Sequence, residues 1–152
     1  MRIKKVLFAL LAFAAAAAAG YFIKESIDSR YPEYALPQIT ATADGEELVC
    51  VLDACSWTFL TGDTYNYGAS QNIFELELAK NELMGGEALN ISFSQQPEAV
   101  TVSRSERYSY EFRPCEGPLT VPYEEGGYLY EIWADYSRGY ELFYLYIVVQ
   151  GA

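Results

Sequence analysis

The sequence of 152 residues contains no histidine, a residue on which many enzyme mechanisms depend. Histidine is the usual general base near neutral pH and a common metal ligand, so its absence excludes Ser-His-Asp and Cys-His catalysis and imidazole-bound metals. The sequence also lacks an acidic calcium loop, a glycine-rich phosphate loop and the G-x-S-x-G turn of hydrolases. We therefore expect no cofactor, no metal and no catalytic activity.

Basic residues are scarce beyond residue 23. That part of the chain has 7 lysines and arginines against 21 acidic residues, which gives a net charge of −14. Proteins bind nucleic acids and anionic lipid headgroups through lysine and arginine. The composition therefore argues against nucleic acid as a partner, and the acidic surface is typical of a soluble domain.

Cysteines are few and odd in number: Cys50, Cys55 and Cys115. Three thiols without histidine are too few for a zinc site. One disulfide is possible, and a bridge between Cys55 and Cys115 is the preferred candidate because it would close a long loop. Three buried, unpaired thiols are the alternative, and an exposed thiol of lowered pKa would indicate a redox role.

The chain begins with a long apolar segment. Val6 to Ile23 is eighteen residues without a charge, and as a helix it would be roughly 27 Å long, close to the hydrocarbon thickness of a bilayer. The basic residues Arg2, Lys4 and Lys5 precede it, so the positive-inside rule predicts a cytoplasmic N-terminus and an exported remainder.

Two interpretations of this segment remain open. Residues 1–23 are either a transmembrane anchor, with the membrane as partner through residues 6–23, or a secretory signal that is cleaved near Ala17 to Ala19. Both place the rest of the chain outside the cytoplasmic membrane. The anchor predicts a single-pass protein, and the signal predicts a secreted one.

Residues 24–37 are predicted as a tether and residues 38–150 as one β domain. Its clearest element is a terminal hairpin of residues 128–135 and 141–149 around Ser137-Arg138-Gly139. Seven or eight short strands without amphipathic helices predict an all-β fold, an immunoglobulin-like antiparallel β-sandwich preceded by one transmembrane or signal helix.

Six further strands are predicted from alternating apolar residues. Asp44-Gly45 is a hairpin signal that joins the first two of them, residues 61–70 are predicted as a loop, and residues 71–83 fit a helix or a strand equally well. The last predicted pair is formed by residues 88–93 and 99–103. The six strands are residues 38–43, 48–52, 56–60, 88–93, 99–103 and 108–112.

Aromatic side chains are the candidate binding residues. Tyr65 and Tyr67 lie in the predicted polar loop, and alternation places Trp133 on the outward face of its strand. Such side chains can stack on a glycan or pack against a protein of the cell envelope. Trp57, in a short Cys-Ser-Trp element, is a further candidate, whereas Tyr128 and Tyr130 have the spacing of core residues.

Acidic residues in predicted loops offer the one remaining route to catalysis. Glycoside hydrolysis needs two carboxylates at a defined separation. The sequence spacing identifies no such pair, so we interpret these residues as solvated turn residues, with a carboxylate-dependent envelope hydrolase as the alternative function. The residues are Asp53, Asp63, Glu124, Glu125 and Asp135.

Four short patterns in order resemble a group of small, uncharacterised extracytoplasmic proteins of Gram-positive bacteria, which have a basic anchor and one immunoglobulin-like domain. This resemblance covers residues 37–149 and implies location and fold, but no activity. Asp53-Ala54-Cys55-Ser56 replaces the Gly-Ser-Tyr that commonly precedes the tryptophan, and Tyr136 replaces a closing tryptophan. The patterns are Pro37, Ile39, Asp44 and Gly45; Cys55, Ser56 and Trp57; Ile91, Phe93, Pro97, Val100 and Val102; and Gly126, Tyr128, Tyr130, Ile132 and Ala134.

Overall fold

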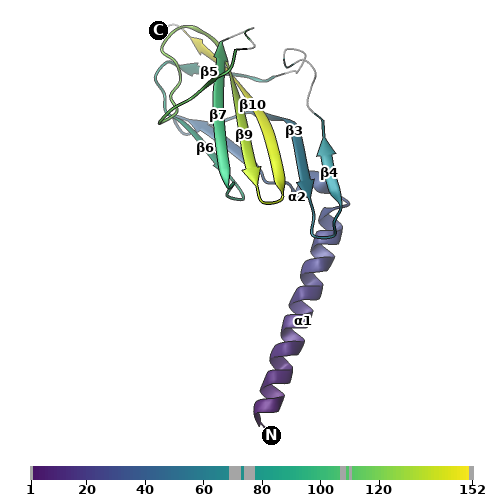
Figure 1. Cartoon of the computed structure of the whole chain (residues 1–152). Helices are drawn as coiled ribbons and strands as arrows, with labels where there is room; N and C mark the ends of the chain where they lie inside the picture. Colours follow the sequence, from purple (N-terminus) through teal and green to yellow (C-terminus); the bar gives the residue numbers. More distant parts are fainter. Residues whose placement is uncertain (1, 69–72, 74–77, 107–108, 110, 151–152) are drawn as a thin grey trace. The chain divides into compact units, whose positions relative to one another are not determined.

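The computed structural model describes residues 2–68, 73, 78–106, 109 and 111–150. Among these residues the chain is mostly β, with an apolar helix at its N-terminus (Figure 1). This confirms the all-β prediction at the level of fold class. The elements are α1 (Arg2–Asp28), α2 (Pro32–Ala35), β1 (Ile39–Ala43), β2 (Glu46–Leu48), β3 (Cys50–Thr58), β4 (Thr64–Tyr67), β5 (Lys80–Met84), β6 (Leu89–Phe93), β7 (Ala99–Glu106), β8 (Arg113–Pro114), β9 (Gly126–Tyr136) and β10 (Gly139–Gln150).

The chain divides into two compact units. The first comprises Met1–Leu36 and Thr58–Tyr65, and the second comprises Pro37–Trp57 and Asn66–Ala152. In the first unit, the buried Glu25 accepts a hydrogen bond from the Leu60 N–H at 3.0 Å. This bond joins the end of α1 to the 58–65 segment.

Helix α1 is longer than the apolar segment predicts. It continues through Lys24 and Glu25 to Asp28, because lysine and glutamate are good helix formers and Lys24 pairs with Asp28 one turn later. Residues 24–37 are therefore not a plain tether: they contain the end of α1 and all of α2, which begins at Pro32.

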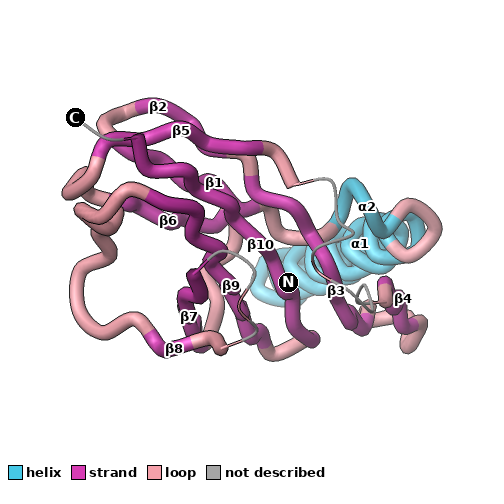
Figure 2. Tube along the Cα trace, turned by 90° about the horizontal axis from the view of Figure 1, so that it is seen from above, coloured by secondary structure: helices cyan, strands magenta, loops and turns pink. Residues whose placement is uncertain are grey.

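The strands form two sheets. The smaller has the order β2-β1-β6, and the larger, seven-stranded sheet has the order β4-β3-β10-β9-β7-β8, with β5 paired to β10. The recorded pairings are antiparallel except β5 with β10, which is parallel. Figure 2 shows β1 and β6 on one side of β7 and β9.

One apolar core lies between the two sheets. Alternate residues of β9 and β10, including Ile132, Leu145 and Ile147, point into it and are fully buried. They meet Ala41 and Ala43 of β1 from the other sheet. The alternation that predicted the terminal hairpin therefore marks the face of each strand that is turned to this core. Leu129, Leu142 and Tyr144 on the opposite face are buried as well, in a smaller cluster.

The predicted strand 48–52 is wrong. Leu48 ends β2, while Cys50 begins β3, a continuous nine-residue strand of the other sheet that includes most of the predicted strand 56–60. At Val49 the chain passes from one sheet to the other, and the buried Asn81 fixes this crossing. Its Oδ1 accepts from the Val49 N–H at 2.9 Å and its Nδ2 donates to the Val49 oxygen at 3.2 Å. Its Nδ2 also donates to the Tyr146 oxygen at 2.9 Å.

Two further pairings differ from the expectation. The predicted neighbours 88–93 and 99–103 belong to different sheets, since β6 pairs with β1 and β7 pairs with β9. Both segments alternate apolar and polar residues because both face the same core, from opposite sides. The predicted loop 61–70 contains β4.

The remaining predictions fall partly outside the described residues. In the ambiguous segment 71–83, residues 80–83 belong to strand β5, whereas 71–72 and 74–77 lie outside the described part. In the predicted strand 108–112, Ser109, Glu111 and Phe112 are not in a strand, and residues 108 and 110 lie outside the description.

Candidate functional sites

An aromatic pair stands on the outer face of the seven-stranded sheet. The Trp133 and Tyr140 rings stack with centroids 4.7 Å apart and planes 13° apart, and both side chains are half-buried. The Trp133 Nε1–H donates to Asp135 Oδ1 at 2.9 Å, which fixes the indole on the sheet. As predicted, Trp133 faces away from the main core, because its neighbours Ile132 and Ala134 point inward.

Sequence reasoning missed Tyr140. The register places Tyr140 opposite Asp135 and Leu142 opposite Trp133, so the two rings meet diagonally across β9 and β10. Such diagonal neighbours are within reach of aromatic side chains. The sequence predicts this hairpin but not the register of its strands, and the register is what brings Tyr140 next to Trp133.

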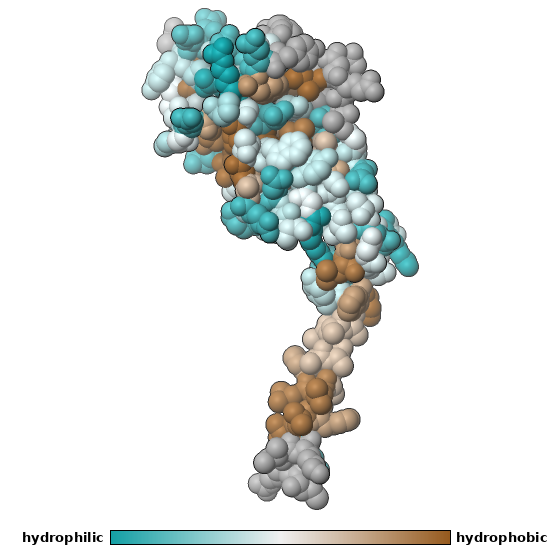
Figure 3. Space-filling view, in the orientation of Figure 1, coloured by the Kyte–Doolittle hydropathy of each residue, from teal (hydrophilic) through white to brown (hydrophobic). Residues whose placement is uncertain are grey.

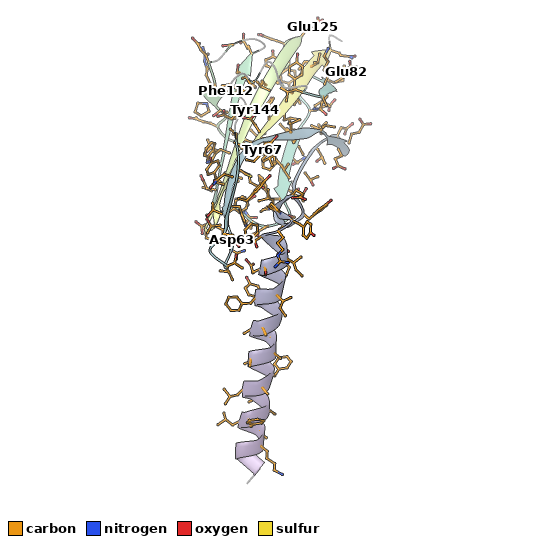
Figure 4. All side chains as sticks on the ribbon, turned by 90° about the vertical axis from the view of Figure 1, so that its right-hand side faces the viewer. Asp63, Tyr67, Glu82, Phe112, Glu125 and Tyr144 are labelled. Atoms are coloured by element: carbon orange, nitrogen blue, oxygen red, sulfur yellow. The ribbon has the colours of Figure 1, made fainter. Side chains whose placement is uncertain are left out.

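Further along the same face, Tyr144 packs beside Phe112. Their ring centroids are 6.3 Å apart, and Figure 4 shows both labelled side chains on one side of the sheet. Burial raises the pKa of Tyr144, and the charges of Glu131 and Asp53 raise it further. The hydroxyl therefore stays protonated and donates to Glu131 Oε2 at 3.3 Å.

The other predicted aromatic residues lie in different environments. Tyr67 is exposed and Tyr65 is half-buried, both in β4. Trp57 is 2% exposed and meets the Tyr136 ring edge-on, with centroids 5.3 Å apart. Trp57 is therefore a core residue in this structure and is not accessible to a ligand.

A buried carboxyl group on β10 was not anticipated. Glu141 is 1% exposed, and neither of its oxygens has a hydrogen-bond partner among the described residues. Burial raises the pKa of Glu141 to about 7, which the neighbouring Tyr136 hydroxyl partly opposes. Glu141 lies on the core-facing side of β10, in line with Phe143 and Leu145, where strand alternation predicts an apolar residue.

The three cysteines are unpaired. Cys50 and Cys115 pack against the main core, and Cys55 lies opposite Glu141 in the β3–β10 register. The predicted Cys55–Cys115 bridge is absent from the structure. Burial raises the pKa of Cys50 to about 11 and is also the main cause of the raised pKa values of Cys55 and Cys115. Protonated thiols are poor nucleophiles, so this state does not favour a redox role.

The predicted carboxylates occupy separate local settings. Asp53 is buried in β3, Asp135 accepts the Trp133 hydrogen bond, and Asp63 accepts from the Thr61 hydroxyl at 2.8 Å. Glu124 and Glu125 are exposed in the loop before β9. The described residues contain no group of three or more cysteine or acidic side chains that could hold a metal ion.

The chain matches no protein-family model, no curated protein and no solved structure.

Proposed function

We propose that this protein is a non-catalytic binding module of the cell envelope, held at the outer face of the cytoplasmic membrane by α1. The observation that carries the proposal is α1 itself. Residues Lys5–Asp28 are long and apolar enough to cross a membrane, and apolar side chains such as Phe8 and Phe13 are about three-quarters exposed. Figure 3 shows the hydrophobic colouring along the part of the helix that is not grey.

A helix that is apolar on all sides requires an apolar environment, because exposing each large side chain to water costs about 1.5–3 kcal/mol. A bilayer provides that environment for an anchor, and it also receives a signal sequence before cleavage. The outward orientation is inferred from the three basic residues that precede the segment.

We propose the outer face around Trp133 and Tyr140 as the ligand-binding surface. Two stacked aromatic rings at the surface, with the Asp135 carboxylate beside them, offer an apolar platform and a hydrogen-bond acceptor. This combination suits a glycan or a protein of the cell envelope. Tyr67 is a secondary candidate because 47% of its surface is exposed.

We further propose that the second unit has an immunoglobulin-like arrangement, like the extracytoplasmic proteins that the sequence resembles. Two sheets that share one core and a tryptophan buried on β3 support this assignment. The parallel pairing of β5 with β10 is an additional feature of this chain.

Location is tested with the full-length chain carrying a C-terminal tag. We expect the protein in the membrane fraction and the tag to be digested by protease added to intact protoplasts. The mass of the mature polypeptide distinguishes an anchor from a cleaved signal. A tag protected until the membrane is opened would contradict the proposal.

Binding is tested by sedimentation of the protein with isolated cell walls. We expect Trp133→Ala to lower the bound fraction about tenfold, as loss of an aromatic anchor does at many interfaces. Tyr123→Ala is the matched control, because it removes an aromatic side chain that is 85% exposed in a separate loop. Equal binding by both variants and the unmodified protein would reject the aromatic surface.

A further inference from the structure

A pocket of about 340 Å³ lies beside β7 and β8, on the other side of the large sheet from the aromatic pair. Its walls come from β7, β8, β9, the 115–120 segment, and Ser109 and Glu111 between β7 and β8. The volume is at the lower end of the range for small-molecule sites. Its lining includes Arg104, Glu106, Arg113, Cys115, Thr120 and Tyr130.

Arg104 is the central feature of this pocket. Its guanidinium carbon lies 5.6 Å from the centroid of the Tyr128 ring, and the group is close enough to the Tyr130 hydroxyl to oppose the effect of burial on that group's pKa. Both tyrosines are themselves held, since their hydroxyls donate to the backbone oxygens of Glu124 at 3.0 Å and Thr120 at 3.4 Å. The guanidinium is therefore oriented by a fixed aromatic support.

Arg104 forms no ion pair with any residue that the structure describes. This is unusual in a chain where acidic residues outnumber basic ones two to one. A half-buried guanidinium has five N–H donors, and its preferred partner is a carboxylate that accepts two of them. Acidic side chains border the same pocket, but none that the structure describes forms an ion pair with Arg104, so its donors stay available for a ligand carboxylate.

Arg113 adds a second positive charge at the same place. The β7–β8 register puts Arg113 directly opposite Arg104, an arrangement that is unfavourable for like charges. The only ion pair recorded for Arg113 in the described residues is with Glu111 at 3.8 Å, and both side chains are more than 80% exposed, so this pair contributes little. A ligand carboxylate would relieve the repulsion between the two arginines.

The rest of the lining limits the class of ligand. Three acidic residues, Glu106, Glu111 and Glu116, also border the pocket. They repel polyanions such as phosphate chains and accept hydrogen bonds from ammonium or hydroxyl groups. A ligand with a single carboxylate and several donors matches both parts of the lining.

We propose that this pocket binds a small ligand through one carboxylate, which Arg104 holds with two parallel hydrogen bonds, while donor groups of the ligand face the acidic border. Two sources supply this chemistry: the end of a peptide and an acidic sugar. The inference does not depend on the membrane anchor or on the aromatic surface.

The test is calorimetric titration of the full-length protein in detergent micelles with four probes. Dialanine and glucuronate carry the carboxylate, and dialanine amide and glucose are their counterparts without it. We expect one carboxylate probe to bind at least about tenfold more tightly than its counterpart, because each pair differs by a charge-assisted interaction. Dialanine binding identifies the peptide source and glucuronate binding the sugar source.

Arg104→Gln is expected to weaken that binding at least about tenfold, and Arg104→Lys to weaken it less, because lysine keeps the charge but loses the two-pronged geometry. Arg138→Gln is the matched control, since it removes an arginine from the β9–β10 turn and should leave affinity unchanged. Thermal unfolding of each variant verifies folding. The proposal is overturned if neither carboxylate probe binds, if the counterparts without the carboxylate bind equally well, or if folded Arg104→Gln binds like the unmodified protein.

Discussion

At the scale of single residues, Asn81 and Glu141 are two buried polar groups with opposite environments. Asn81 makes three hydrogen bonds to the backbone of neighbouring segments, so its burial is compensated. Glu141 makes none among the described residues, and burial favours its neutral form. The first residue fixes a strand crossing, whereas the second makes stability depend on pH.

The pH dependence has a definite sign. Because the pKa of Glu141 rises from 4.5 to about 7 on folding, the folded state retains a proton that the unfolded state releases between these values. Glu141 therefore lowers the free energy of unfolding as pH increases from about 4.5 to 7, by on the order of 3 kcal/mol in total. Below pH 4.5 both states hold the proton and the effect vanishes.

We expect Glu141→Gln to remove this dependence. Urea unfolding of the variant and of the unmodified protein should agree near pH 4.5, and the variant should be more stable by about 2 kcal/mol at pH 8. Glu98→Gln, in an exposed position just before β7, is the control and should not change the pH profile. A Glu141→Gln variant that is equally destabilised at both pH values would contradict the assignment.

At the scale of elements, the β9–β10 hairpin is the centre of the larger sheet. Eleven residue pairs connect its strands, and β3, β5 and β7 attach to its two sides. At its turn, Gly139 has a φ of 151°, and a Cβ there would lie 1.8 Å from the Ser56 oxygen. The hairpin can approach β3 at this point only because residue 139 has no side chain.

We expect Gly139→Ala to destabilise the protein by more than about 3 kcal/mol, since the clash is with backbone that cannot move without breaking the β3–β10 pairing. Thermal unfolding measures the change. Gly68→Ala is the matched control, because a Cβ at Gly68 meets no atom within 4 Å. Near-equal melting temperatures for the two variants would show that the close approach does not exist in solution.

At the scale of the whole molecule, an exposed apolar helix and an acidic β unit belong to one chain. If α1 spans a bilayer, charges near its middle oppose insertion by about 2.5–3.5 kcal/mol each. We expect Leu11→Arg combined with Ala15→Arg to reduce the membrane-bound fraction at least about tenfold. Leu11→Ala with Ala15→Leu preserves the composition and should fractionate as the unmodified protein does. Retention of the double arginine variant in the membrane would refute a spanning role.

The sequence by itself determined the features that depend on local periodicity. The uncharged run Val6 to Ile23 predicted α1, and alternation from Tyr128 to Ala134 predicted the terminal hairpin and the outward position of Trp133. These patterns are readable because each residue's neighbours in sequence report which face is buried. The absence of histidine likewise excluded Ser-His-Asp and Cys-His catalysis from the sequence alone.

Only the tertiary structure decided which strands pair and which side chains meet. Residues 88–93 and 99–103 have the same alternation but lie in different sheets, and Arg104 and Tyr128 are brought together across the β7–β9 pairing. Glu141 is buried because β10 is flanked on both sides at this position, by Cys55 of β3 and Ala134 of β9. Long-range pairing follows from how both sheets cover one core, and no local pattern encodes that choice.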